Sequence, residues 1–322
     1  MDRRGVWLLP RLGFRLRKTT RGSLGANMSR IFSISPRSGH RPLTMGQLMA
    51  LGPADLRPYN IDFDHVESFL AASPAQLVST WGIDPYSSRG FELEFSGGAY
   101  RAIVSTPSSP NDWRITLDFL AALAGHLDAP ILDEDGTAYS PDSITAFPFT
   151  RDIGIGLASL QSSLDNGNTV MLDGVRRRVA VTPAMLRRIT GAPSPADEFG
   201  ETMRVIQQLD AYDASQMVAR SPKGEILGMY TITQSVRTIL PLAPTVSRGI
   251  REQIGTNTAV DWRINLIACD GPSDRAESYV PAGEVAYREA VERLPRDKVR
   301  VLDGASMLIE ALDRDELDAL RA

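Results

Sequence analysis

The 322-residue chain is poor in the side chains that bind metals and form disulfides, with one cysteine and three histidines. A single cysteine, Cys269, excludes a disulfide within the chain and suits a reducing compartment such as the cytoplasm. His40, His65 and His126 do not stand at metal-ligand spacing from one another, so a zinc site of Cys and His ligands is not expected. We therefore expect neither a metal nor a cofactor.

Long apolar runs and familiar catalytic motifs are also missing. No stretch approaches the roughly 18–20 apolar residues of a membrane span, so no membrane segment is expected. The patterns G-x-S-x-G, G-x-x-x-x-G-K-[ST] and G-x-G-x-x-G do not occur. Their absence excludes a recognisable hydrolase elbow, P-loop or dinucleotide-binding turn. An enzyme that uses an unfamiliar arrangement of side chains is not excluded.

Charge is distributed unevenly along the chain. Residues 1–27 contain seven Arg or Lys residues and one acidic residue, so the net charge of −4 leaves −10 on residues 28–322. This acidic body argues against nucleic acid as the main partner, because binding to phosphates depends on clustered cations. Residues 1–27 lack an apolar periodicity, and we predict a disordered basic leader followed by a folded part that begins near Met28.

The stretch from Ser88 to Gly136 has the clearest local pattern. Alternating apolar residues at Phe91, Leu93 and Phe95 predict a strand, and Ser96-Gly97-Gly98 predicts a turn into a second strand at 100–104. Ser109 and Pro110 are typical of a helix start. The apolar residues of the helix recur at spacings of three and four, at Trp113, Leu117, Leu120, Ala124 and Leu127. We expect this stripe to pack on the Phe91 side of the hairpin.

These patterns predict an α+β fold, with antiparallel sheets and helices packed on one face. The segment Ala192-Pro193-Ser194-Pro195 resembles a linker, so we expect α+β domains at 28–191 and 196–322, or one intimately packed unit. Further helices are predicted at 74–81, 283–294 and 305–312, and the best strand of the second half at 260–268.

Four polar residues are candidates for a binding site. Arg89 precedes the hairpin, and Asp112 and Arg114 lie at the helix start, where polar ligands often bind. Glu134 lies in the turn Asp133-Glu134-Asp135-Gly136, which lacks the spacing of a calcium loop. The structural alternative is that Asp112 caps the helix, Arg114 pairs with Asp118, and the 133–136 turn is merely solvated.

The segment Ser88-Arg89-Gly90-Phe91-Glu92-Leu93, with Tyr100, Thr106-Pro107, Asp112-Trp113 and the Glu134-Asp135-Gly136 turn, resembles an uncharacterised bacterial family. This domain-of-unknown-function family comprises cytoplasmic proteins of about 300 residues. The resemblance covers the chain from near Met28 onward. It implies a bacterial source and supplies neither an activity nor catalytic residues.

The first functional hypothesis is a non-catalytic protein-interaction module, of which an immunity-like or toxin-neutralising protein is one form, with another protein as its partner. It follows from the acidic body and from the absence of a recognisable catalytic motif. The second hypothesis is a hydrolase or transferase that uses carboxylate and arginine side chains, with Arg89, Asp112 and Glu134 as candidates. The third is a structural or phage-derived assembly component.

Overall fold

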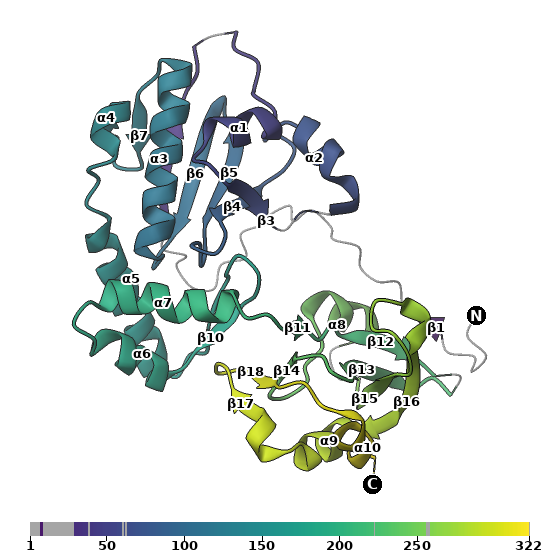
Figure 1. Cartoon of the computed structure of the whole chain (residues 1–322). Coiled ribbons are helices and arrows are strands. Elements are labelled where there is room, and N and C mark those ends of the chain that lie inside the picture. The colour runs from purple at the N-terminus through teal and green to yellow at the C-terminus, as the bar shows by residue number, and fades with distance from the viewer. Residues whose placement is uncertain are drawn as a thin grey trace. The chain divides into compact units, whose positions relative to one another are not determined.

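The computed structural model describes residues 7–8, 29–37, 39–59, 61, 63–221, 223–255 and 258–321 (Figure 1). The predicted leader lies outside these ranges, apart from strand β1 (Trp7–Leu8). The described chain divides into two compact units: the N-terminal unit ends at Leu209, and the C-terminal unit begins at Asp210 and includes β1. This division follows Leu209, whereas the sequence places a boundary at 192–195.

A seven-stranded antiparallel sheet organises the N-terminal unit. In spatial order the strands are β3 (Leu56–Tyr59), β4 (Ser79–Ile83), β5 (Phe91–Ser96), β6 (Ala99–Ser105), β2 (Ser29–Ile34), β7 (Ile131–Asp133) and β8 (Ala138–Tyr139). The predicted hairpin is β5–β6, in which Phe91 and Leu93 are buried. Gly97 and Gly98 adopt positive φ angles of 62° and 81° at its turn, where glycine is favoured.

Helix α3 (Pro110–Leu127) packs on this sheet (Figure 1). Ser109 Oγ accepts the Asp112 N–H at 3.0 Å, which satisfies one free donor of the first turn. The ring of Phe119 lies 5.1 Å from that of Phe91 on β5. Trp113 is fully buried, but its aromatic neighbours are Phe32, Phe147 and Phe149 and not the hairpin. The aromatic contact with the hairpin is thus made by Phe119, outside the expected stripe, while Trp113, the first residue of that stripe, turns toward β2.

Six further helices belong to the described part of the N-terminal unit. They are α1 (Met45–Leu51), α2 (Val66–Ala71), α4 (Pro141–Ile144), α5 (Phe149–Asp165), α6 (Pro183–Thr190) and α7 (Pro195–Gln207), with a short 3₁₀ turn at Phe63–His65. Three of these helices, α1, α4 and α6, begin with a Ser or Thr side-chain cap. A separate hairpin pairs β9 (Val170–Leu172) with β10 (Val179–Val181). Its loop is held by buried Gln207, whose Oε1 accepts the N–H groups of Arg176 and Arg177 at 2.9 Å each.

The C-terminal unit contains two sheets. The first has the order β1, β12 (Met217–Arg220), β13 (Ile226–Thr233), β15 (Val260–Cys269) and β16 (Tyr279–Ala286). The second has the order β11 (Tyr212–Asp213), β14 (Thr238–Pro241), β18 (Ser306–Ile309) and β17 (Val299–Val301). Helices α8 (Arg248–Ile254), α9 (Tyr287–Arg293) and α10 (Arg314–Ala319) complete the unit with 3₁₀ turns at Ala276–Ser278 and Arg296–Lys298.

The α+β class is confirmed, although β13 pairs with β15, and β11 with β14, in parallel. Three predicted helices are wrong in whole or in part. Residues 79–81 belong to β4, residues 283–286 to β16 and residues 306–309 to β18. Short apolar runs such as Met307-Leu308-Ile309 suit a buried strand as well as a helix, and pairing with β14 and β17 decides between them.

Within the described ranges, none of the helices is both long and apolar enough to cross a membrane.

Candidate functional site

The buried carboxylate of Asp112 joins the start of α3 to the loop that precedes β5. It accepts hydrogen bonds from the backbone N–H groups of Ser88, Arg89 and Gly90, at 3.1, 3.0 and 2.9 Å. The hydroxyls of Ser88 and Ser109 also donate to it, each at 2.7 Å. These bonds satisfy both carboxylate oxygens inside the protein. The predicted capping role of Asp112 is wrong: Ser109 caps α3, and the Asp112 carboxylate binds a loop that is distant in sequence.

The backbone N–H of Arg89 contacts this carboxylate, while the Arg89 side chain binds two backbone carbonyl oxygens. Its Nε donates to the Asp173 carbonyl oxygen at 2.9 Å, and Nη1 donates to the Pro107 carbonyl oxygen. Burial lowers the pKa of the Arg89 guanidinium to about 10, partly offset by the charges of Asp112 and Asp173. The group still carries its charge at neutral pH, and it serves to tie the β9–β10 loop to the start of α3.

Arg114 lies on the exposed side of the first turn of α3. Its Nη1 donates to Asn111 Oδ1 at 3.2 Å, and its guanidinium lies 5.9 Å from the ring centre of Phe149. These contacts replace the expected pairing with Asp118. Arg114 therefore pairs with Asn111 three residues earlier in the same helix.

Glu134 lies apart from the Asp112 carboxylate and belongs to a cluster around Arg30. Nη1 of Arg30 contacts Glu134 Oε1 at 3.1 Å and Asp135 Oδ2 at 3.0 Å, and Nη2 contacts Asp152 Oδ1 at 2.9 Å. The hydrogen bond to Asp152 is the main reason that the pKa of Arg30 is raised. The 133–136 turn is thus held by an arginine from β2, which the sequence does not reveal.

A stack of aromatic rings separates the Arg114 and Arg30 contacts. Trp113 stacks on Phe147 and Phe149 at centroid distances of 5.6 and 5.8 Å, and Arg30 lies 5.8 Å from the ring centre of Phe147. Trp113 is fully buried, so this stack belongs to the core. Of the four candidates, the structure brings Arg89 and Asp112 together, and it places Arg114 and Glu134 at separate contacts.

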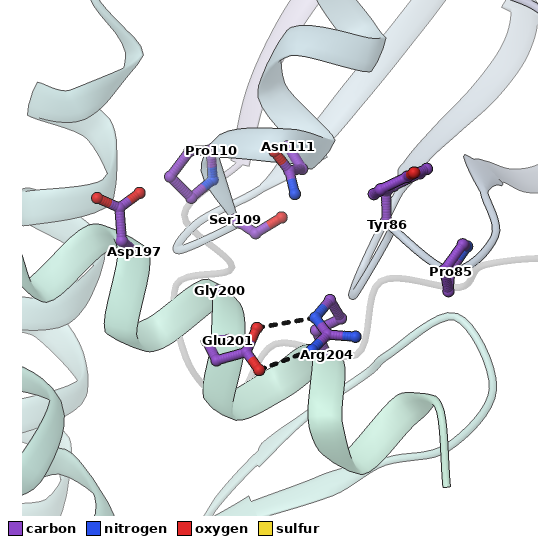
Figure 2. Close-up of a pocket in the computed structure, with 9 residues that line it drawn as sticks. All are labelled: Pro85, Tyr86, Ser109, Pro110, Asn111, Asp197, Gly200, Glu201 and Arg204. Carbon is purple, nitrogen blue, oxygen red and sulfur yellow. Dashed lines mark hydrogen bonds and ion pairs between the residues drawn. The ribbon is translucent and has the colours of Figure 1, made fainter. Parts of the chain in front are cut away.

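A surface cavity of about 330 Å³ opens beside the start of α3. Figure 2 shows Asn111 on one wall, Tyr86 on another, and Glu201 and Arg204 of α7 opposite the start of α3. Arg204 donates from Nε and Nη2 to Oε2 and Oε1 of Glu201, at 2.8 and 2.7 Å. This bidentate contact lowers the pKa of Glu201, so the pair is ionised at neutral pH.

Sequence reasoning missed Tyr86, Glu201 and Arg204. The Glu201–Arg204 spacing of three is visible in the sequence as a helical ion pair, but such pairs are common on surfaces. Only the packing of α7 near the start of α3 turns this pair into a cavity wall. Among the described residues, no group of three or more His, Cys, Asp or Glu side chains is arranged to hold a metal ion.

The fold and these contacts define an α+β protein with a polar cavity beside the start of α3. The nearby carboxylate of Asp112 accepts its hydrogen bonds from groups inside the protein. Residues 29–320 match the model of a family described as Domain of unknown function (DUF4299). The chain belongs to this family, and the match covers the region in which the sequence resemblance was recognised. No curated protein and no solved structure matches the chain.

Proposed function

We propose that this protein is a non-catalytic interaction protein of the bacterial cytoplasm that binds another protein through the face of the N-terminal unit around the cavity. The observation that supports this most is the state of the candidate catalytic groups. Asp112 has its carboxylate oxygens filled by backbone and hydroxyl donors, and Arg89 is bound to two backbone carbonyls. A general acid or base must reach substrate, and these groups do not present their polar atoms to the cavity.

The rim of the cavity offers features that suit a protein partner. The side chain of Tyr86, which lines the cavity beside Arg204, is 58% exposed. Tyrosine and arginine are the residue types that contribute most to protein interfaces, because each combines a large contact area with polar atoms. The catalytic and assembly alternatives have no comparable observation in their favour.

Affinity capture followed by reconstitution tests this function. The full chain is immobilised, proteins from a bacterial lysate are captured, and each candidate partner is purified and titrated against the chain by calorimetry. Tyr86→Ala is expected to weaken the interaction at least tenfold, while Tyr212→Ala, which removes an exposed tyrosine of the C-terminal unit, leaves it unchanged. Equal binding by the two variants, or no saturable binding by any purified candidate, would contradict the proposal.

A further inference from the structure

We infer that the cavity in Figure 2 binds a carboxylate of the partner protein, with Arg204 as its main contact. This inference rests on the proposed function and adds to it the chemistry of the contact. The partner's carboxylate, which accepts the hydrogen bonds, belongs to an Asp or Glu side chain or to a carboxyl terminus. The cavity holds one such group together with the few neighbouring atoms to which it is bonded.

The guanidinium of Arg204 has one edge occupied and one edge available. Glu201 binds the edge formed by Nε and Nη2, at 2.8 and 2.7 Å. A guanidinium carries five N–H groups, so the Nη1 group and the second hydrogen of Nη2 are left. Within the described part of the chain, these donors have no hydrogen-bond partner. Their spacing matches the two oxygens of a carboxylate, the arrangement that makes arginine contacts strong.

Glu201 also fixes the position of Arg204. The Arg204 side chain is 34% exposed, and its bidentate contact joins two residues three positions apart on α7. A guanidinium that is already held in place loses less conformational freedom when it binds a second acceptor. The cavity therefore presents a preorganised donor pair.

Asn111 supplies a further donor on the opposite wall. Its Oδ1 accepts from Arg114 Nη1 at 3.2 Å, which turns the amide nitrogen toward the cavity (Figure 2). Tyr86 closes a third side with a half-exposed aromatic side chain. An acceptor between Arg204 and Asn111 is thus met by N–H donors from two elements that are distant in the sequence. Both donors are side-chain N–H groups, so the site does not rely on the free backbone N–H groups at the start of α3.

The surrounding charges favour a carboxylate over a phosphate. Glu201 is ionised beside Arg204, and Asp197 lies on the same helix seven residues earlier, about 10 Å along its axis. A dianionic phosphate meets roughly twice the repulsion from these groups that a singly charged carboxylate meets. The lining carries two carboxylates, Asp197 and Glu201, and one arginine, so the selection of an anion rests on the free N–H donors of Arg204, which require an acceptor. A single negative charge is the acceptor that the cavity fits best.

Nuclear magnetic resonance of the full chain tests the inference with small probes. The side-chain amide signals of Asn111 are followed during titration with N-acetyl-glutamate amide, N-acetyl-glutamine amide and inorganic phosphate. We expect saturable shifts with the glutamate probe, and weaker or no shifts with the other two. Equal shifts from the glutamine probe would show that a negative charge is not needed for binding and would contradict the inference. Stronger binding of phosphate would also contradict it and would assign the cavity to phosphorylated ligands.

Matched variants separate the cavity from general surface charge. Arg204→Gln is expected to weaken binding of the glutamate probe about tenfold or more, the usual effect of losing a charge-assisted contact. Arg188→Gln removes another arginine paired with a glutamate, Glu198 from α7, and is expected to leave probe binding unchanged. Asn111→Ala leaves Arg204 intact and is expected to weaken binding of the glutamate probe less than Arg204→Gln does. Binding to this variant is measured through the Arg204 Nε–H signal. Unchanged binding by Arg204→Gln would overturn the inference.

The two proposals fail in different ways. If a purified partner binds the wild-type chain and Arg204→Gln equally, the interaction function stands and the carboxylate contact is wrong. If the glutamate probe binds through Arg204 but no protein partner binds, the cavity chemistry stands and the interaction function fails. Thermal melting of each variant shows that it is folded before either result is counted.

Discussion

Asp112 and Trp113 are adjacent at the start of α3, and both side chains are fully buried. One is polar and accepts hydrogen bonds from the loop at 88–90; the other is aromatic and stacks between Phe147 and Phe149. Arg114 follows them on the exposed side of the helix. Three consecutive residues thus have three different surroundings, and their substitutions are expected to have different costs.

Asp112→Ala is expected to lower the free energy of unfolding by about 3–4 kcal/mol, because several buried N–H and O–H donors lose their acceptor together. Urea denaturation of wild type and variant measures the difference. Asp118→Ala, which removes an exposed aspartate from the same helix, is the control and is expected to change stability by less than about 0.5 kcal/mol. Similar values for the two variants would contradict the structural role of Asp112.

Trp113→Ala is expected to cost about 3–5 kcal/mol, the usual effect of truncating a buried large aromatic side chain. Trp113→Phe preserves part of the stack and is expected to cost only about 1 kcal/mol, because the buried indole N–H has no hydrogen-bond partner among the described residues. Arg114→Ala is expected to cost well under about 1 kcal/mol, since its contacts are exposed. A Trp113→Ala variant that melts like wild type but no longer binds a partner would make this position a surface site.

At the scale of elements, the β5–β6 hairpin and α3 are joined by the loop at 88–90. Gly90 has a φ of +63°, and its N–H donates to Asp112 Oδ1 at 2.9 Å. A Cβ at this position would lie 2.2 Å from the Trp81 carbonyl oxygen on β4. The close approach of β4 to this loop therefore depends on glycine.

Gly90→Ala is expected to destabilise the protein by about 3 kcal/mol or more, because backbone strain and a clash with a fixed carbonyl act together. Gly97→Ala is the matched control, since Gly97 has a φ of +62° and a Cβ added there would meet no described atom within 4 Å. It is expected to cost about 1–2 kcal/mol from strain alone. Equal losses in chemical denaturation would show that the contact with Trp81 is relieved by movement of the loop.

At the scale of the whole molecule, each unit has apolar residues buried among its own elements. In the N-terminal unit, α3 covers the sheet through contacts such as Phe119 with Phe91. In the C-terminal unit, one cluster gathers Tyr230, Leu240, Leu266, Met307 and Leu317. Separate cores are the physical basis for independent folding of domains.

A chain of residues 29–209 is expected to fold by itself and to unfold in one cooperative transition. Its strands pair with one another, and its buried side chains need no residue beyond 209 for the contacts described above. Circular dichroism melting and the dispersion of amide signals measure this. A non-cooperative melt with poorly dispersed signals would show that the C-terminal unit is needed for the fold.

Stability is expected to fall as the pH rises above about 10, where tyrosines of the unfolded chain ionise. Burial raises the pKa of Tyr230 and Tyr287, so the folded protein keeps protons that the unfolded chain releases. This difference favours the unfolded state only on the alkaline side. Urea denaturation between about pH 8 and 11 measures the decline, and Tyr287→Phe is expected to flatten it, unlike Tyr86→Phe on the exposed surface. An unchanged slope in Tyr287→Phe would contradict this assignment.

The local elements were predictable because their signals lie within a few residues. Ser109 and Pro110 specify the start of α3, the alternation at Phe91 and Leu93 specifies β5, and the alternation at 260–268 specifies β15. Predictions were wrong for 79–81 and for 306–309, where the short apolar run Met307-Leu308-Ile309 fits two structures. There the pairing partner, and not the run itself, selects the strand.

By itself, the sequence determined the α+β class, the hairpin, the capped helix and the burial of Trp113, all of which follow from caps and from periodicities of two and 3.6. Tertiary structure alone decided that Asp112 binds the loop at 88–90, that Arg30 holds Glu134, and that Arg204 of α7 faces Asn111 of α3. These contacts join residues far apart in the chain, and periodicity carries no information on which distant elements meet. The cavity therefore exists only once α7 has packed beside the start of α3.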